Sequence, residues 1–476
     1  MSVARRALLI SALLLVGGLV FSPHWFYPYP FHVDEWHHLA QARALFANNS
    51  HPEIGFQLFL RLLAPFDPVL IYKFLPALWA IFSALALFWL VYVRSKKDFW
   101  LAWWSVIFFA TLKSNVNLLG LWFFTPLTFA LPFVLLYLYF FTEGLERRSR
   151  QYLLAALAIM LGLLPVHAIS VLFALPFLTL LVLLYYRDDL KRDWLFFATF
   201  LLVPLSGLIF YQWSAGLSWR ELLSDLPAHL WFAKSWGVLE LKNSPFELYS
   251  PIGYLLALAG AATIVWRRCW REQALFWLWP LSLLGSIAVY RIFDSSFLVP
   301  YQRNLFYLAI AWPYLSALGL LAWWRFLNQR VFPESQKIII FGLAAVLSGL
   351  VILAAFRDYN LQPPGVALYQ VIDDRDYAAL RALAAWPKGR VMTDFFLGTA
   401  LPAITPHRPV ASIYFNRLYK EAVVEFFLTA DCARRQELIA THRVRYVLSQ
   451  ETLTCVGELI YDQGPYLYQV KPNDDH

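Results

Sequence analysis

The sequence is poor in charged residues and in cysteine. Asp, Glu, Lys and Arg together make up 15% of its 476 residues, whereas hydrophobic residues make up 60%. An average soluble domain contains roughly 25% charged residues, so this composition excludes an ordinary soluble protein and indicates an integral membrane protein. The three cysteines, Cys269, Cys432 and Cys455, match no metal-site spacing and are too few for a disulfide framework. Cys432 and Cys455 could still pair if the C-terminal tail is extracytoplasmic.

The formal net charge of +8 does not indicate a nucleic-acid partner. The basic residues fall in short clusters between long apolar segments, which is the distribution that the positive-inside rule predicts for cytoplasmic loops. Membrane topology therefore explains the charge, and we expect no nucleic acid among the partners. The basic clusters lie at residues 94–97, 147–150, 187–192, 267–271 and 325–337.

Apolar runs recur along the chain at about the length needed to cross the hydrocarbon core. Arg5 and Arg6 precede the first run, and no small-residue cleavage site follows it, so we interpret it as an uncleaved helix. The run through Pro165 could be two segments or one kinked helix. With two segments there, the predicted membrane helices number about eleven, at residues 7–21, 69–93, 99–112, 121–141, 152–164, 168–186, 194–213, 249–266, 274–292, 305–324 and 338–356.

The predicted fold of residues 1–356 is an all-α polytopic membrane bundle with interfacial helices in its first outer loop. Because every loop assigned to the inside is basic, the N-terminus is expected to be cytoplasmic. An odd number of crossings then puts the first loop and the C-terminal tail on the same outer side. We therefore predict a multi-pass protein of the plasma or inner membrane whose C-terminal domain is extracytoplasmic.

From residue 357 the composition becomes that of a small soluble domain, and residues 357–476 are predicted to form an extracytoplasmic α/β domain. No glycine-rich phosphate-binding motif occurs in it, so we assign it packing or acceptor contact and no chemistry. The expected helices are 376–386 and 420–442, and the expected strands are 390–393, 409–413, 445–448 and a hairpin of 457–462 with 466–471.

The stretch HVDEWHH at residues 32–38 follows the first hydrophobic segment directly. It places two adjacent carboxylates and three imidazoles at a membrane surface, where ionisable groups are costly. Asp34 could be the N-cap of an amphipathic helix that buries Trp36 and Leu39 and leaves His37 and His38 on the wet side. Capping would explain one carboxylate but not the cluster. An acid at the mouth of a transmembrane bundle therefore indicates a functional site.

This stretch resembles the signature of the GT-C superfamily, the polytopic glycosyltransferases that use sugars carried on polyprenyl or dolichyl phosphate. Members carry an acidic pair in the first extracytoplasmic loop, often as His-Pro-Asp-Glu, and this chain reads His32-Val33-Asp34-Glu35. The resemblance is to the mannosyltransferase and aminoarabinose-transferase branches and covers about three quarters of the chain. It implies transfer, with inversion, from a polyprenyl-phosphate-sugar donor to a glycan, lipid or protein hydroxyl, as in the synthesis of cell-envelope glycans.

The resemblance also implies roles for individual residues. Asp34 is the expected base that activates the acceptor hydroxyl, with Glu35 beside it. Arg303 is the expected partner of the donor phosphate, because a guanidinium gives fixed, bidentate donors, and Arg291 is the second choice. Tyr301 is expected to contact substrate beside them. The alternative for each arginine is snorkelling at the interface or an ion pair with Asp294.

A divalent cation is a further open question. His37, His38 and Glu53 are expected to contact substrate, and His38, His51 and Glu53 are weak candidates for metal ligands, since imidazole with carboxylate suits zinc or manganese. Some GT-C relatives use a cation. Imidazoles on a wet helix face are more often solvated or bonded to neighbours, so no metal is predicted with any certainty.

A transporter or flippase of lipid-linked saccharides is the alternative function. Such a protein is expected to have inverted repeats, matching broken helices and buried charges in the middle of the bundle. No repeat is visible in the sequence, and Lys73 is the one clear charge inside a predicted segment. The sequence therefore favours the glycosyltransferase.

Overall fold

The computed structural model describes the chain in two compact units, each of which is discontinuous in sequence. The first consists of Met1–Phe26, Ser50–Phe56 and Phe74–Gln362, and the second of Tyr27–Asn49, Gln57–Lys73 and Pro363–His476. The described residues are 1–44, 53–63, 66–113, 120–214, 218, 220, 224, 230–233, 249–330, 342, 346, 349–350, 352–354, 356, 370–414 and 416–470.

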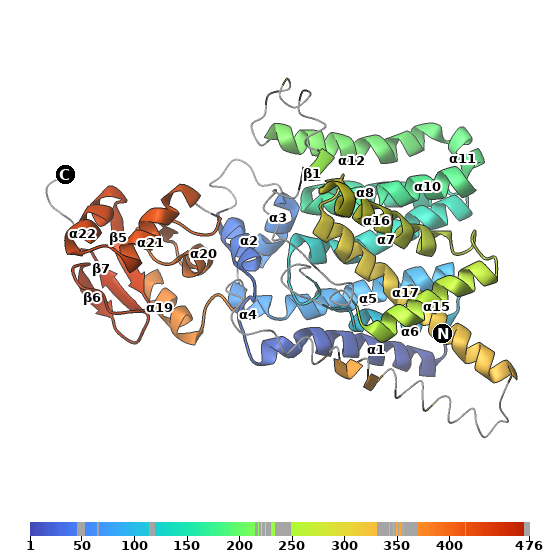
Figure 1. The fold of residues 1–476 in the computed structure, drawn as a ribbon, viewed down its shortest axis with the longest axis horizontal. Helices are drawn as coiled ribbons and strands as arrows, with labels where there is room; N and C mark the ends of the chain where they lie inside the picture. The colour runs from blue at the N-terminus through green and yellow to red at the C-terminus, as the bar shows by residue number, and fades with distance from the viewer. Residues whose placement is uncertain are drawn as a thin grey trace. The chain divides into compact units, whose positions relative to one another are not determined.

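The first unit is a bundle of apolar helices packed side by side (Figure 1). The helix α17 packs against α6, α15 and α16, and the helix α5 packs against α1, α6 and α7. The helices are α1 (Val3–Phe21), α5 (Leu75–Arg94), α6 (Phe99–Ala110), α7 (Pro126–Glu146), α8 (Arg150–His167), α9 (Ile169–Leu172), α10 (Leu175–Tyr185), α11 (Arg187–Arg192), α12 (Trp194–Ser214), α15 (Pro251–Trp266), α16 (Ala274–Phe293) and α17 (Tyr301–Arg330).

Six helices in the described part of the chain are long and apolar enough to cross a membrane. Shorter apolar helices match further predicted segments, so the polytopic bundle is confirmed. The last predicted segment, 338–356, lies mostly outside the described residues, and the count of about eleven crossings stays a prediction. The six are Val3–Trp25, Val69–Arg94, Pro126–Glu146, Arg150–His167, Ala274–Phe293 and Tyr301–Phe326.

Prolines and polar residues move several helix ends from their expected places. The segment expected from residue 121 becomes helical only at Pro126, which occupies the first helical position, where its missing N–H costs nothing. The helix α8 continues through Pro165 to His167, and the break in the run follows at Ala168. Lys73 is the C-cap of α4 (Pro68–Tyr72), so within the apolar span Val69–Arg94 it lies at the turn between α4 and α5.

Two glycines let α15 and α17 approach each other closely. A Cβ atom on Gly319 would clash with the carbonyl oxygen of Leu256, and one on Gly260 would clash with that of Leu315. Small residues at such crossings are typical of membrane helix pairs, whose association depends on close packing.

We expect Gly319→Ala to destabilise the bundle by about 1–3 kcal/mol, because the added methyl group meets rigid backbone. Gly285→Ala is the matched control, since nothing lies within 4 Å of that position on α16. The control should be neutral or slightly stabilising, as alanine favours helix over glycine by roughly 0.5–1 kcal/mol. Thermal unfolding of the purified variants in the same detergent makes the comparison, and equal melting temperatures would contradict the close packing.

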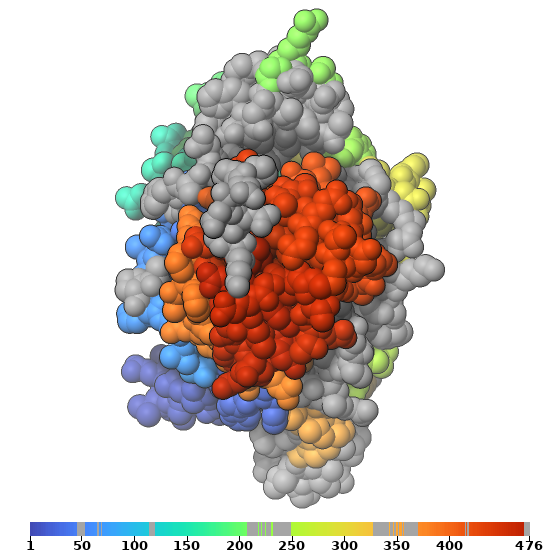
Figure 2. All heavy atoms as spheres, turned by 90° about the vertical axis from the view of Figure 1, so that its left-hand side faces the viewer, coloured from blue at the N-terminus to red at the C-terminus, as the bar shows by residue number. Residues whose placement is uncertain are grey.

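The second unit contains a five-stranded mixed sheet in the order β4-β3-β5-β7-β6. The strand β3 pairs in parallel with β4 and β5, whereas β7 pairs antiparallel with β5 and β6. The C-terminal residues form the orange and red body that faces the viewer in Figure 2. The strands are β3 (Arg390–Met392), β4 (Arg408–Pro409), β5 (Val444–Ser449), β6 (Glu458–Tyr461) and β7 (Tyr466–Gln469).

Aspartates begin three of the helices around this sheet. Asp373, Asp394 and Asp431 are the N-caps of α19 (Asp374–Ala384), α20 (Phe395–Ile404) and α22 (Cys432–Thr441), and each side chain accepts from backbone N–H groups of the first turn. A single helix over 420–442 was expected, but α21 (Lys420–Leu428) and α22 are separate. The strand expected over 409–413 is only Arg408–Pro409, and α20 was not predicted at all.

The acidic stretch near the N-terminus belongs to this second unit. The Tyr27 hydroxyl donates to the carbonyl oxygen of Ile372 at 2.7 Å. The backbone N–H of Gln370 donates to the carbonyl oxygen of Phe31 at 2.8 Å. The helix α2 (Val33–Arg43) then packs against α20. The C-terminal sheet and the acidic stretch therefore belong to one compact unit. The predicted domain boundary at residue 357 separates these two segments. Cys432 and Cys455 are joined by a disulfide within it.

Candidate functional site

The helix α2 presents Asp34 in its first turn without using it as the cap. The N-cap is His32, whose Nδ1 accepts from the backbone N–H of Asp34 at 3.1 Å. The interpretation of Asp34 as N-cap is therefore wrong, because the helix begins at Val33, one residue before it. The Asp34 carboxylate lies near the positive end of the helix dipole, and its side chain is 26% exposed.

Glu35 holds the turn from which Asp34 projects. Its side chain is fully buried, and its Oε2 accepts from the backbone N–H groups of Phe31 at 2.8 Å and His32 at 2.9 Å. This is the reciprocal half of a capping box, in which a carboxylate reaches back to the N-cap. The two adjacent acids thus have different surroundings: Glu35 is committed to the backbone and Asp34 is partly open to solvent.

Tyr414 is a partner of Asp34 that the sequence analysis missed. Its hydroxyl donates a hydrogen bond to Oδ1 of Asp34, and its ring stacks on His37 with the ring centres 4.1 Å apart. The tyrosine lies in the loop after β4, where the Asn416 side chain donates to the carbonyl oxygen of Val410 at 3.2 Å. No local pattern marks Tyr414, because it lies 380 residues from Asp34 in the sequence.

His38 is buried in a polar network, which differs from its expected place on a wet helix face. Gln57 lies between two side chains of α2, with its Nε2 3.3 Å from Nδ1 of His38 and 2.6 Å from Oε1 of Gln41. Burial lowers the pKa of His38 to about 3, so the imidazole is neutral at physiological pH. A neutral, buried imidazole packs α2 and donates no proton to a reaction at neutral pH.

The described residues do not assemble a metal centre. Within the described ranges no three His, Cys, Asp or Glu side chains are grouped so that they could hold an ion. Nδ1 of His38 already faces Gln57. Glu53 belongs to the first unit and directly precedes the helix α3 (Ile54–Leu62), and His51 lies outside the described residues. Among the described residues, the candidate ligands are therefore not gathered around a common point.

Arg303, Arg291 and Tyr301 belong to the first unit, around the loop between α16 and α17. Tyr301 is buried, its ring stacks on Tyr290 at 4.1 Å, and the Arg291 guanidinium lies over the Tyr301 ring at 5.3 Å. These contacts give Arg291 and Tyr301 a packing role, with a cation–π contribution.

Arg303 is half-buried in the first turn of α17, and the preceding loop is fixed beside it. Asn304 donates to Oγ of Ser296 at 3.1 Å and to the carbonyl oxygen of Val299 at 3.3 Å. The strand β2 (Ser295–Phe297), which was not predicted, pairs antiparallel with β1 (Trp231–Ala233). Asp34 and Arg303 are in different units, so their meeting at one substrate stays a prediction.

Near Arg303, at a break between two helices, His167 takes part in a chain of hydrogen-bonded polar side chains. A hydrogen bond of 2.6 Å joins Nδ1 of His167 to Oγ of Ser170, which in turn is bonded to the hydroxyl of Tyr307, one turn beyond Arg303. Polar side chains satisfy one another here where the helix is interrupted, as they must inside a bilayer. His167 is therefore structural.

The architecture defines a class of protein: an apolar helical bundle with a small α/β unit that contains the acidic first loop. No protein-family model matches this chain, and no curated protein sequence matches it. Solved structures do match it by fold, and they are polytopic membrane glycosyltransferases of the GT-C superfamily. The resemblance noted in the sequence is thus confirmed for the fold.

The matching structures include those of an oligosaccharyltransferase from Archaeoglobus fulgidus. The archaeal enzyme AglB, in complex with an inhibitory peptide and a dolichol-phosphate, matches with a TM-score of 0.61 and 12% identity over 94% of this chain and 69% of that one. A crystal structure with a tethered acceptor peptide containing the NVT sequon gives 0.60 and 13% over the same shares. A complex with Zn and sulfate gives 0.61 and 15% over 93% and 68%. At these identities the similarity concerns the fold.

Proposed function

We propose that this protein is an integral membrane glycosyltransferase that transfers a sugar from a polyprenyl-phosphate-linked donor to an extracytoplasmic hydroxyl, with inversion. One observation carries the proposal. The carboxylate of Asp34 projects, partly exposed, from a helix start that Glu35 and His32 already cap. A carboxylate that is not needed for capping and is held at a fixed position is suited to act as a general base. The GT-C fold of the chain favours a lipid-linked donor.

The proposed reaction is a single displacement. The Asp34 carboxylate takes the proton of the acceptor hydroxyl while the acceptor oxygen forms a bond to the anomeric carbon of the sugar. The bond from that carbon to the phosphate oxygen breaks, and its electron pair leaves with the polyprenyl phosphate. Attack from the side opposite the leaving group inverts the anomeric configuration.

Two further side chains would assist this displacement. Arg303 would hold the donor phosphate and stabilise the negative charge that develops on it, because a guanidinium matches phosphate geometry. Tyr414 is a positioning residue, because its hydroxyl donates a hydrogen bond to one carboxylate oxygen of Asp34. A glycan, lipid or protein hydroxyl each suits this chemistry. The structure of AglB is that of a complex with an inhibitory peptide and a dolichol-phosphate.

The disulfide between Cys432 and Cys455 supports an extracytoplasmic place for this site. Disulfides form and persist in oxidising compartments and are rare in the cytosol. Because these cysteines and Asp34 belong to the same compact unit, the acidic stretch would share the outer side of the membrane with them. This agrees with basic inner loops and an inner N-terminus.

Purified protein in lipid nanodiscs can test the proposal with synthetic polyprenyl phosphates that carry radiolabelled hexoses, pentoses or aminopentoses. We expect release of free polyprenyl phosphate from at least one donor, by transfer to an acceptor from cell-envelope extract or, more slowly, to water. Asp34→Asn is the control for background hydrolysis. A protein that releases no polyprenyl phosphate but moves intact donor across liposome membranes would be a flippase, and the proposal would fail.

A further inference from the structure

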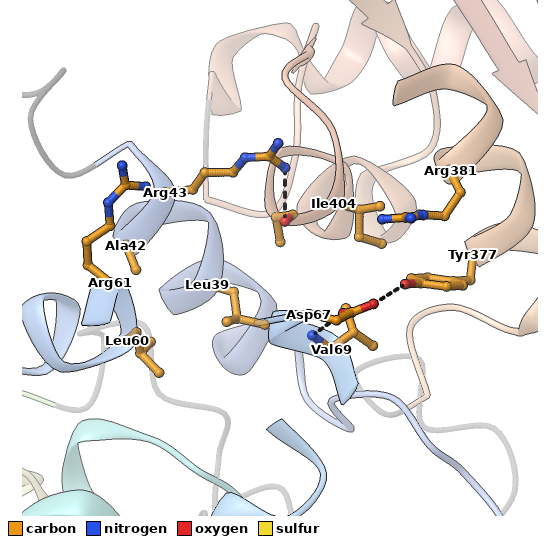
Figure 3. Close-up of a pocket in the computed structure, with 11 residues that line it drawn as sticks. Leu39, Ala42, Arg43, Leu60, Arg61, Asp67, Val69, Tyr377, Arg381 and Ile404 are labelled. Carbon is orange, nitrogen blue, oxygen red and sulfur yellow. Dashed lines mark hydrogen bonds between the residues drawn. The ribbon is translucent and has the colours of Figure 1, made fainter. Parts of the chain in front are cut away.

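A cavity of about 230 Å³ lies within the second unit, at the opposite end of α2 from Asp34 (Figure 3). We call it the arginine cavity, because Arg43, Arg61 and Arg381 line it. Nine residues separate Asp34 from Arg43 on α2, which is about 13 Å along the helix axis. The cavity is therefore distinct from the proposed transfer site.

The lining of the arginine cavity is strongly positive. Among the described residues that line it, Asp67 supplies the only carboxylate, so three guanidinium groups against one carboxylate leave an excess of two positive charges. Asp67 is already committed, since its Oδ1 caps the helix α4 at 3.0 Å from the backbone N–H of Val69 and its Oδ2 accepts from the Tyr377 hydroxyl at 3.3 Å. It does not neutralise the three arginines.

The arginines keep most of their donors for a ligand. Arg43 donates one hydrogen bond, from Nη1 to the carbonyl oxygen of Ala403 at 3.2 Å. In the part of the chain that the structure describes, no carboxylate forms a salt bridge with Arg43, Arg61 or Arg381. Figure 3 shows Arg43 and Arg381 extending toward Ile404 from opposite sides. Partial burial and, to a smaller extent, the charge of Arg61 lower the pKa of Arg43, and a bound anion would offset both effects.

Apolar side chains border the cavity and the helices beside it. Leu39, Leu60 and Ile404 give it apolar walls, while the three arginines are exposed to solvent. Next to Arg61, the helices α3 and α4 and their connection expose several large apolar side chains, as interfacial helices do. These are Leu58, Leu62, Phe66 and Leu70, with exposed fractions of 45%, 75%, 61% and 56%.

We propose that the arginine cavity binds a phosphate group through the guanidinium groups of Arg43 and Arg381, with Arg61 adding positive charge to the lining. Guanidinium forks match the tetrahedral oxygens of phosphate, and the volume admits the group together with part of what carries it. The group belongs either to the headgroup of an anionic phospholipid or to a soluble phosphate. The proposal does not depend on the transfer reaction, since no residue of the cavity takes part in it.

The full-length protein in nanodiscs of phosphatidylcholine provides the test. Native mass spectrometry measures retention of phosphatidylglycerol against phosphatidylcholine, and thermal unfolding measures stabilisation by millimolar inorganic phosphate. We expect Arg381→Gln and Arg43→Gln each to weaken the binding roughly tenfold or more, the loss of one charge-assisted hydrogen bond. Arg375→Gln is the matched control, because Arg375 is exposed on the same helix α19 and does not line the cavity.

The two probes separate the two sources. Retention of phosphatidylglycerol without an effect of inorganic phosphate assigns the cavity to a lipid headgroup, and the reverse assigns it to a soluble phosphate. Arg381→Lys keeps the charge and should restore binding in part, which separates loss of binding from loss of fold. If neither probe binds, or if binding is the same in Arg381→Gln, Arg43→Gln and Arg375→Gln, the proposal is overturned.

Discussion

Asp34→Asn is expected to lose roughly a hundredfold to ten-thousandfold of sugar transfer while the protein folds and binds its donor normally. An acceptor hydroxyl is barely ionised at neutral pH, so attack on the anomeric carbon depends on a base that takes its proton. Asparagine has the size of aspartate and can still accept from the Tyr414 hydroxyl, but it takes no proton. The measurement is kcat with a labelled polyprenyl phosphosugar, alongside donor affinity.

The neighbouring residues provide controls for this variant. Glu35→Gln should act mainly on stability, by about 1 kcal/mol, because its carboxylate accepts two backbone N–H groups and is buried. Tyr414→Phe should reduce kcat about tenfold or less, with donor affinity unchanged, since it removes one hydrogen bond that positions Asp34. Full transfer activity in purified Asp34→Asn would remove Asp34 from the role of base.

Arg303→Ala is expected to lower kcat/KM roughly a hundredfold. A charge-assisted hydrogen bond to a phosphate in a poorly solvated groove is worth about 2–3 kcal/mol, and that energy converts to this factor. Arg303→Lys should recover part of the loss, because an ammonium keeps the charge but not the fork. Donor binding and turnover are measured separately. A contact that Arg303 already makes in the donor complex would change donor binding, whereas one made only in the transition state would change turnover alone.

Arg291→Ala is the matched control for Arg303. Its guanidinium lies over the ring of Tyr301, so its loss should loosen the end of α16 and leave transfer nearly unchanged. If Arg291→Ala abolished transfer and Arg303→Ala were fully active, the two arginines would exchange their proposed roles.

Apolar length and prolines made most of the bundle predictable. The segments expected at 194–213, 249–266 and 274–292 agree closely with α12, α15 and α16, because a bilayer demands long runs without charge. The first residue of a helix was harder to predict where several polar residues could serve as its N-cap. Asp34 is a better N-cap than histidine by propensity, yet Glu35 reaches back to the N–H of His32 and fixes the N-cap two residues earlier than propensity predicts.

The surroundings of Asp34 could not be read from local sequence. Tyr414 and Gln57 carry no motif, and each reaches α2 only through the packing of distant segments. Asp394 followed by an apolar run is a pattern that predicts the helix α20. Gly398 and Pro402 within that run argue against a helix, because both residues have low helix propensity. The arginine cavity likewise depends on residues 43, 61 and 381, which only the folded unit gathers.

The pairing of Tyr27 with Ile372 also sets an order of events during biosynthesis. The two residues lie 345 positions apart. At roughly 5–20 residues per second, a ribosome needs roughly 20 to 70 s to make that stretch. The acidic stretch is thus synthesised long before the residues that hold it exist, and Asp34 acquires its fixed position only when the last quarter of the chain arrives. An incomplete translation product would carry both acids without the long-range hydrogen bonds of Tyr414 to Asp34 and of Tyr27 to Ile372.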